Sequence, residues 1–311
     1  MTGLTIDERV RSLRPPKKYV DPFSAHGSLL ETERRPDGTI ASALTIFLAG
    51  AECPFTCSFC DLWKFTIDGP TPPGALTAQL EGAIAGVRAQ RLKLYNASNF
   101  FDTRAVPPED LAGIANIAAS FDALTVESHA NTIGPRVLDF ARTIPGRLEV
   151  AVGLETVHPG AASKLNKKLD LGRFDKAAEF LRENDIDLRV FVLLGVPHIP
   201  PVESVEWTVT TAQYAIDRGA ALVSIIPVRG GNGEMERLES IGEFVPPALS
   251  QLEDALDQCR GFPRAVVTAD LWDVDRLSAC DACRPQRIAR LERQNHTGVS
   301  EDRIKCSTCS G

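Results

Sequence analysis

Three cysteines, Cys53, Cys57 and Cys60, are grouped at spacings of four and three residues. Thiolates are the usual ligands of iron–sulfur clusters, so three of them on one short segment can wrap around a cluster of iron and sulfide. A [4Fe–4S] cluster held entirely by protein needs a fourth cysteine, and this segment offers none, which leaves one iron open to an outside ligand. Structural zinc generally takes four protein ligands, so zinc is the weaker interpretation. Cysteines that serve only for packing would have no reason to follow this spacing.

Four more cysteines form two pairs near the end of the chain, Cys280 with Cys283 and Cys306 with Cys309. Each pair has the Cys-x₂-Cys spacing of a metal knuckle, and two such knuckles match a zinc ribbon with four thiolate ligands. The same four thiolates could instead hold a second, fully ligated [4Fe–4S] cluster. The knuckle spacing favours zinc without deciding between the two. The eighth cysteine, Cys259, has no partner at metal-binding spacing, and we expect it to pack in the core.

The elements that must position these cysteines alternate regularly from residue 44 onward. Short apolar and β-branched runs are followed by segments with apolar residues at helical spacing, which favours a parallel sheet covered by helices. Six strand–helix units predict an α/β fold, a partial (β/α)6 TIM-like barrel, with a doubly wound sheet as the alternative. We expect strands at Leu44–Leu48, Leu92–Asn96, Ala123–Glu127, Leu148–Gly153, Leu188–Leu194 and Leu222–Pro227, and helices near 74–90, 108–120, 134–143, 174–184, 202–218 and 247–258.

Ligands bind at the carboxyl ends of the strands in both kinds of fold. The first cysteine group follows the first expected strand, Asn96–Asn99 end the second, Glu127 the third and Glu155 the fourth, so these groups should meet at one rim. A glycine-rich loop, Pro227–Glu234, ends the sixth strand and is interpreted as a plain mobile turn.

We expect three parts along the chain. Residues 1–40 form an N-terminal arm that is irregular apart from one short helix, residues 41–262 form the partial barrel, and residues 263–311 form a small C-terminal cysteine-rich metal-binding module. Residues 1–19 lack the apolar segment of a secretory signal, and the apolar runs are too short to cross a bilayer. We therefore expect a cytoplasmic protein with no membrane partner.

The charge of the chain bears on nucleic-acid binding. Its formal net charge of −7 argues against a broadly basic face, although not against a local patch. Four arginines spaced by three residues follow the first C-terminal knuckle and could form a face for RNA phosphates; they are Arg284, Arg287, Arg290 and Arg293. Acidic neighbours dilute this series, so a solvated helix face is the favoured interpretation.

The Cys-x₃-Cys-x₂-Cys spacing, with Phe59 just before the third cysteine, resembles the signature of the radical S-adenosylmethionine (radical SAM) superfamily. The resemblance covers about residues 40–260. It implies a [4Fe–4S] cluster on Cys53, Cys57 and Cys60 whose open iron chelates the amino and carboxylate groups of S-adenosylmethionine. An external one-electron reductant of the flavodoxin or ferredoxin type would supply the electron that cleaves this cofactor to methionine and a 5′-deoxyadenosyl radical, which abstracts a substrate hydrogen.

The same resemblance implies roles for five further residues. Ser98 and Asn99 fall where the superfamily has a loop that contacts the methionine amine, and the strand-end carboxylates Glu127 and Glu155 suit the ribose hydroxyls. The Gly-Leu-Glu-Thr segment ending at Thr156, followed by Leu-Asn-Lys ending at Lys167, is similar to the Elongator catalytic subunit and the radical SAM subunit of archaeosine synthase. In that neighbourhood Lys167 would lie near the carboxylate of S-adenosylmethionine.

Three functions follow from these observations. The nearest resemblance implies a radical SAM enzyme that modifies a base in tRNA. The alternative within the same chemistry is a small-molecule substrate in natural-product or cofactor biosynthesis. A third hypothesis, from a different class, is a zinc-dependent RNA-binding protein in which the first cysteine group is incidental; it predicts a colourless protein that contains zinc alone.

Overall fold

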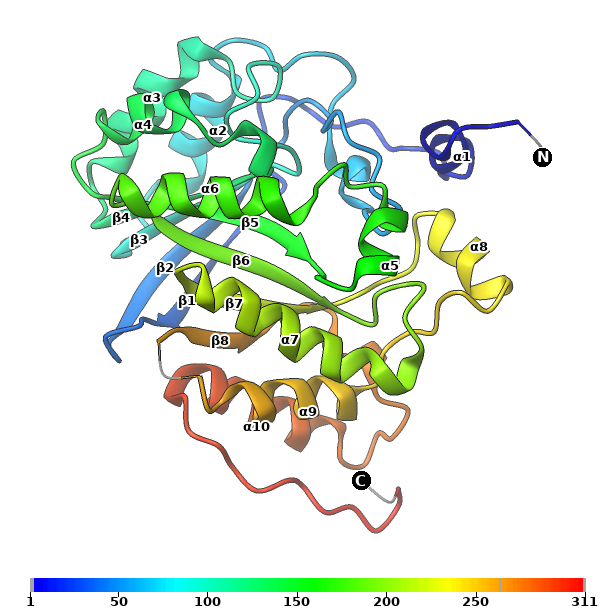
Figure 1. Ribbon diagram of the computed structural model, residues 1–311. Helices are drawn as coiled ribbons and strands as arrows, with labels where there is room; N and C mark the ends of the chain where they lie inside the picture. Colours follow the sequence, from blue (N-terminus) through cyan, green and yellow to red (C-terminus); the bar gives the residue numbers. More distant parts are fainter. Residues whose placement is uncertain (1–2, 263, 310–311) are drawn as a thin grey trace.

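The computed structural model describes residues 3–262 and 264–309 and has an eight-stranded sheet in the order β1 to β8. β1 runs antiparallel to β2, and all other neighbouring strands are parallel. The six expected strands correspond to β2–β7, so the α/β partial barrel is confirmed (Figure 1). The strands are β1 (Gly27–Arg34), β2 (Ile40–Phe47), β3 (Arg91–Tyr95), β4 (Ala123–Ser128), β5 (Arg147–Glu155), β6 (Asp187–Leu194), β7 (Ala220–Pro227) and β8 (Val266–Ala269).

Helices cover the outer face of the sheet, and all six expected helices are found (Figure 1). The α-helices are α1 (Ile6–Ser12), α2 (Ala75–Ile84), α3 (Pro108–Ala118), α4 (Pro135–Ala141), α5 (Pro159–Ala162), α6 (Leu171–Glu183), α7 (Ser204–Asp217), α8 (Glu234–Ser240), α9 (Leu249–Cys259) and α10 (Arg284–Thr297). Short 3-10 helices lie at Leu62–Phe65, Ala130–Thr132, Ser163–Leu165, Pro201–Glu203 and Val274–Leu277. None of the helices in the described ranges combines the length and apolarity that a membrane crossing requires.

Helix α6 shows how the sequence produces the outer layer. The Asp170 side chain accepts a hydrogen bond from the Arg173 amide and so caps the first turn. Phe174, Ala177 and Leu181 then recur at helical spacing and are buried against the sheet. Burial of an apolar stripe on each helix holds the outer layer on the strands.

The inner face of the sheet carries charge at the beginnings of the strands. Arg189 of β6 is 3% exposed and pairs with Glu33 of β1 at 2.7 Å and with Glu149 of β5 at 2.9 Å. Lys93 of β3 adds a longer contact of 3.4 Å to Glu33. Buried charges are tolerated because each has an opposite partner. The charged side chains thus fill this end of the barrel and leave the carboxyl ends of the strands for ligands.

Strand β1 was not expected, because residues 1–40 were interpreted as irregular apart from a short helix, which is α1. The strand gives a weak sequence signal since its inward side chains, Glu31 and Glu33, are acidic and its remaining side chains are mostly exposed. β8, at the other edge of the sheet, has four residues and was also missed.

Helix α10 packs against both edge strands, β1 and β8, and covers the gap between them. Asn295 exchanges two hydrogen bonds with the backbone of Ala269 in β8, at 2.9 and 2.8 Å. His296 contacts Thr32 of β1 at 3.1 Å. Because one helix bridges both edges, the C-terminal segment completes the wall of the barrel.

The interpretation of the arginine series as a solvated helix face is wrong for its two central members. Arg287 pairs with Glu253 of α9, and Arg290 is 1% exposed and pairs with Asp257 at 2.9 Å. The outer members also have acidic partners; Arg293 pairs with Glu301 at 2.8 Å. Arg287 and Arg290 therefore hold α10 on α9, and all four arginines have acidic partners, so they are not a free phosphate-binding face. Cys259 is 2% exposed in the same core, which confirms its packing role.

Candidate cluster and cofactor site

The segment 48–61, which we call the ligand loop, joins the carboxyl end of β2 to the first 3-10 helix and carries Cys53, Cys57 and Cys60. All three cysteines are half-buried and unpaired by disulfides. Burial raises the pKa of Cys53, raises that of Cys57 to about 12 and raises that of Cys60 further. The thiols are therefore protonated at neutral pH, and a metal that binds them must displace the protons.

Two buried asparagines from distant segments hold the ligand loop. Asn166 donates from Nδ2 to the carbonyl of Thr56 at 2.8 Å, and Asn232 donates to the carbonyl of Ser58 at 2.8 Å and of Cys60 at 3.2 Å. Asn232 is 1% exposed, so the loop Pro227–Glu234, expected to be a plain mobile turn, is packed against the ligand loop instead.

The N-terminal arm also fastens the ligand loop. The Asp7 carboxylate of α1 accepts hydrogen bonds from Thr56 Oγ1 and from Asn166 Nδ2. These bonds hold the pKa of Asp7 below its ordinary value. Further along the arm, Arg14 pairs with Glu52 at 2.7 Å, one residue before the first cysteine. The conformation of the ligand loop is thus fixed from three sides.

Glu155 and Lys167, both expected near the cofactor, form a buried ion pair at 2.6 Å. Glu155 ends β5 with φ +69°, at a bulge where the register with β6 shifts, and such backbone strain is frequent at functional sites. Burial lowers the pKa of Lys167, but the adjacent Glu155 carboxylate, together with the nearby sulfurs of Cys57 and Cys53, outweighs burial and the pKa is raised. Lys167 is therefore charged at neutral pH.

Glu127 lies at the end of β4 and turns its carboxylate toward the loop that follows β3. It accepts a hydrogen bond from the Asn96 amide at 2.6 Å, and backbone amides of Ala97 and Ser98 also stabilise its charge. Burial nevertheless raises the pKa of Glu127 to about 7. Glu127 thus anchors the loop that carries Ser98, whose buried Oγ has no hydrogen-bond partner among the described residues.

Asn99 lies beside the first cysteine. Its Nδ2 is 3.6 Å from Cys53 Sγ, and its Oδ1 accepts a hydrogen bond from the His129 amide at 2.7 Å. The structure therefore brings Asn99 to a candidate cluster ligand, while the expected contacts of Ser98 and Asn99 with the methionine amine stay predictions.

His129 belongs to the site and was missed from the sequence. Its Nδ1 accepts from the Asn131 amide, so Nε2 carries the proton and donates to the Lys167 carbonyl at 2.9 Å. The ring stacks on Phe55 of the ligand loop at 4.2 Å between centroids. Burial lowers the pKa of His129 to about 4, so the ring is neutral. The sequence could have indicated His129 because it directly follows β4, and residues at the carboxyl ends of the strands form the rim where ligands bind.

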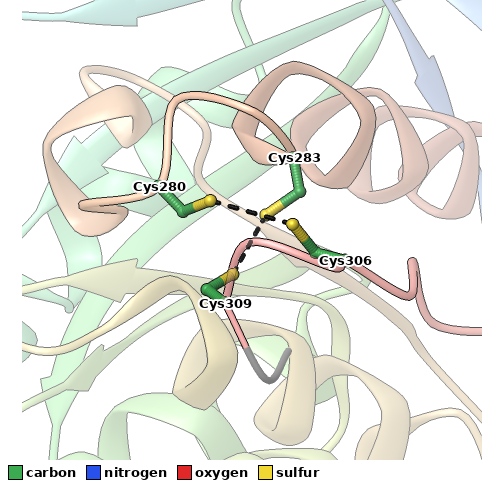
Figure 2. A group of neighbouring side chains, drawn as sticks. All are labelled: Cys280, Cys283, Cys306 and Cys309. Atoms are coloured by element: carbon green, nitrogen blue, oxygen red, sulfur yellow. Dashed lines mark hydrogen bonds between the residues drawn. The ribbon is translucent and has the colours of Figure 1, made fainter.

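The second cysteine group is assembled around the start of α10 (Figure 2). Sγ atoms of Cys280 and Cys306 lie 3.9 Å apart, and those of Cys283 and Cys309 lie 3.6 Å apart. The four sulfur atoms all lie within 4.8 Å of one another, which is close enough for all four to bind one metal ion. Backbone amides of Cys309 and Thr308 lower the pKa of Cys306 to about 6, which favours the thiolate that a metal requires. The C-terminal cysteines could therefore bind a metal together.

The donor atoms of the two groups suit different metal centres. Three sulfur donors on the ligand loop fit an iron–sulfur cluster that keeps one iron open, since the fourth position is left to an outside ligand. Four sulfur donors close together fit a fully ligated metal.

No protein-family model matches the chain. An uncharacterized protein of Methanocaldococcus jannaschii is 23% identical over 257 residues, which cover 75% of this chain and 69% of that protein. Among solved structures, Elp3 of the archaeon Methanocaldococcus infernus is 13% identical, with a TM-score of 0.53, and the match covers 72% of this chain and 59% of that chain. This chain thus spans less than two thirds of that structure.

Two further solved structures have the same fold. A radical SAM methyltransferase from Sphaerobacter thermophilus is 16% identical, with a TM-score of 0.52, over 78% of this chain and 73% of that chain. Spore photoproduct lyase is 12% identical, with a TM-score of 0.52, over 71% of this chain and 75% of that chain. The chain therefore resembles radical SAM enzymes and has their partial-barrel fold.

Proposed function

We propose that this protein is a radical SAM enzyme. The observation that carries the proposal is the ligand loop, which presents three cysteines at the carboxyl end of β2 in a barrel of the radical SAM fold. Three cysteines at this spacing on a different fold would not support a radical SAM function, because the proposal needs both the cysteine ligands and the radical SAM fold.

The residues of the chain have separate roles in this proposal. Cys53, Cys57 and Cys60 would hold a [4Fe–4S] cluster with three thiolates and leave one iron open for S-adenosylmethionine. Lys167, kept charged by Glu155, attracts the cofactor's carboxylate. When bound, the cluster would supply the one-electron chemistry of radical SAM enzymes, which is reductive cleavage of S-adenosylmethionine followed by hydrogen abstraction from a substrate, and an external flavodoxin- or ferredoxin-type protein would be the reductant.

The C-terminal cysteines hold zinc in this proposal. Zinc lies about 2.3 Å from each thiolate, so a tetrahedral site places neighbouring sulfurs about 3.8 Å apart. The observed separations of 3.9 and 3.6 Å agree with that value. A [4Fe–4S] cluster binds each thiolate at a different iron corner and so requires wider spacing. Zinc here would tie the C-terminal tail to the start of α10.

The substrate of the proposed reaction carries a planar ring. The Tyr95 ring of β3 lies 6.4 Å from the Phe47 ring of β2 and 6.1 Å from the Phe191 ring of β6, measured between centroids. Phe47 also lies 6.2 Å from Trp272, which follows β8 and is 63% exposed. Aromatic faces favour stacking with planar groups. This favours a nucleobase, as in tRNA modification. A gel shift with bulk tRNA at two salt concentrations tests it: no binding even at low salt would indicate the small-molecule alternative.

The radical SAM proposal is tested by anaerobic reconstitution with iron and sulfide. The protein should become brown and, with dithionite and S-adenosylmethionine, should form 5′-deoxyadenosine. Cys57→Ala should lose this product, whereas Cys259→Ala, which removes a packing cysteine of the core, should retain it. A protein that stays colourless and contains zinc alone would support the RNA-binding hypothesis instead.

A further inference from the structure

The side chain of Asn99 links the ligand loop to the end of β4. Asn99 is 2% exposed, and both ends of its amide contact protein groups. A backbone amide can only donate, so the atom facing the His129 amide at 2.7 Å is the oxygen, Oδ1. The NH₂ end must then face Cys53 Sγ, at 3.6 Å. The hydrogen-bond network thus fixes which end of the amide meets the sulfur.

Asn99 gives Cys53 a side-chain donor in addition to the backbone amide of Phe55, which also stabilises a charge on this sulfur. The two other asparagines that hold the ligand loop, Asn166 and Asn232, donate to backbone carbonyls and, in the case of Asn166, to side-chain oxygens. Asn99 is therefore placed to act on the electronic state of the sulfur, while the other two act on the conformation of the loop.

We propose that Asn99 raises the reduction potential of the cluster by donating an N–H···S hydrogen bond to the Cys53 thiolate. Reduction adds one electron, supplied by the external flavodoxin- or ferredoxin-type protein, and the added negative charge is shared with the cysteine sulfurs. A donor on a ligand sulfur stabilises the more negative, reduced state, and hydrogen bonds to sulfur are among the factors that set cluster potentials. The inference rests on the proposed function, because it requires the cluster on the ligand loop.

The test uses two variants of Asn99 in the reconstituted full-length protein. Asn99→Asp keeps an acceptor for the His129 amide but cannot donate to sulfur, and Asn99→Ala removes both contacts. Asn232→Ala is the matched control, because it loosens the ligand loop without touching a sulfur. Each protein is titrated with a reductant of known potential, and the reduced cluster is measured by electron paramagnetic resonance.

Both Asn99 variants should have a more negative midpoint potential than the unmodified protein. At the potential where half of the clusters in the unmodified protein are reduced, fewer than half should be reduced in either variant. The Asn232→Ala midpoint should stay close to that of the unmodified protein. An unchanged midpoint in both Asn99 variants, or an equal shift in the control, would overturn the inference. Loss of the cluster from both Asn99 variants alone would overturn it in favour of a role in assembly. If the unmodified protein takes up no iron, the proposed function itself fails.

Discussion

Replacing Gly153 by alanine should break the Glu155–Lys167 ion pair without altering either charged residue. A Cβ at Gly153 would collide with Glu155 Oε1 and lie 2.7 Å from Lys167 Nζ. The two charged atoms are themselves only 2.6 Å apart, with side chains 7% and 13% exposed, so there is little room to absorb a methyl group. Overpacking of this kind costs about 1–3 kcal/mol. Complete loss of a buried ion pair costs about 3–5 kcal/mol, so the free energy of unfolding should not fall by more than this in Gly153→Ala.

Urea unfolding of the metal-free protein measures this loss, and the reconstituted variant should form less 5′-deoxyadenosine. Gly82→Ala is the control, because Gly82 lies in α2 with open space around it; that change should be neutral or stabilise by up to about 1 kcal/mol. In a Glu155→Ala background the colliding oxygen is gone, so the cost of Gly153→Ala should shrink by at least about 0.5 kcal/mol. An equal cost in both backgrounds, or no cost in either, would refute the steric argument.

Three further results are expected. Because burial lowers the pKa of His129 to about 4, the contribution of His129 to the free energy of unfolding should fall by up to about 3 kcal/mol as the pH drops from about 6.5 to 4. Glu127, whose pKa burial raises to about 7, contributes in the opposite direction over the same range, so the effect is measured as the difference between the pH profiles of the unmodified protein and His129→Gln; a difference that stays constant with pH would contradict it. Arg290→Ala should cost about 1.5–3 kcal/mol in urea unfolding, because the guanidinium is 1% exposed and its hydrogen bonds to the half-buried Asp257 carboxylate are lost, although Asp257 keeps Arg303 as a partner; Arg142→Ala, in an exposed pair, should cost less than about 1 kcal/mol. Cys309→Ser should lower the zinc content in elemental analysis and leave the iron content unchanged; loss of both metals would contradict two independent sites.

The sequence predicted the parallel strands and the rim because these depend on local patterns. Apolar runs such as Leu188–Leu194 are buried in β6, and the polar residues after each strand follow from chain direction. The edge strand β1 could not be recognised, since its inward Glu33 reads as a surface charge until Arg189, far along the chain, is placed beside it.

The contacts within the site were also beyond the sequence. Asn232 and Asp7 hold the ligand loop across long sequence separations, and no spacing pattern marks either residue. The arginine series illustrates the opposite error: its spacing predicted a helix correctly, but whether Arg290 faces solvent depends on α9, which packs on that helix. Residue type and spacing thus predict the candidate ligands, while the three-dimensional packing determines which residues contact them.

Electron paramagnetic resonance of the dithionite-reduced, reconstituted protein, recorded with and without S-adenosylmethionine, tests the central claim most directly. A cluster with three cysteine ligands and one open iron should give a signal that changes when the cofactor is added, because the cofactor binds that iron. Identical spectra with and without the cofactor, from a protein that has taken up about four irons on the ligand loop, would contradict the account.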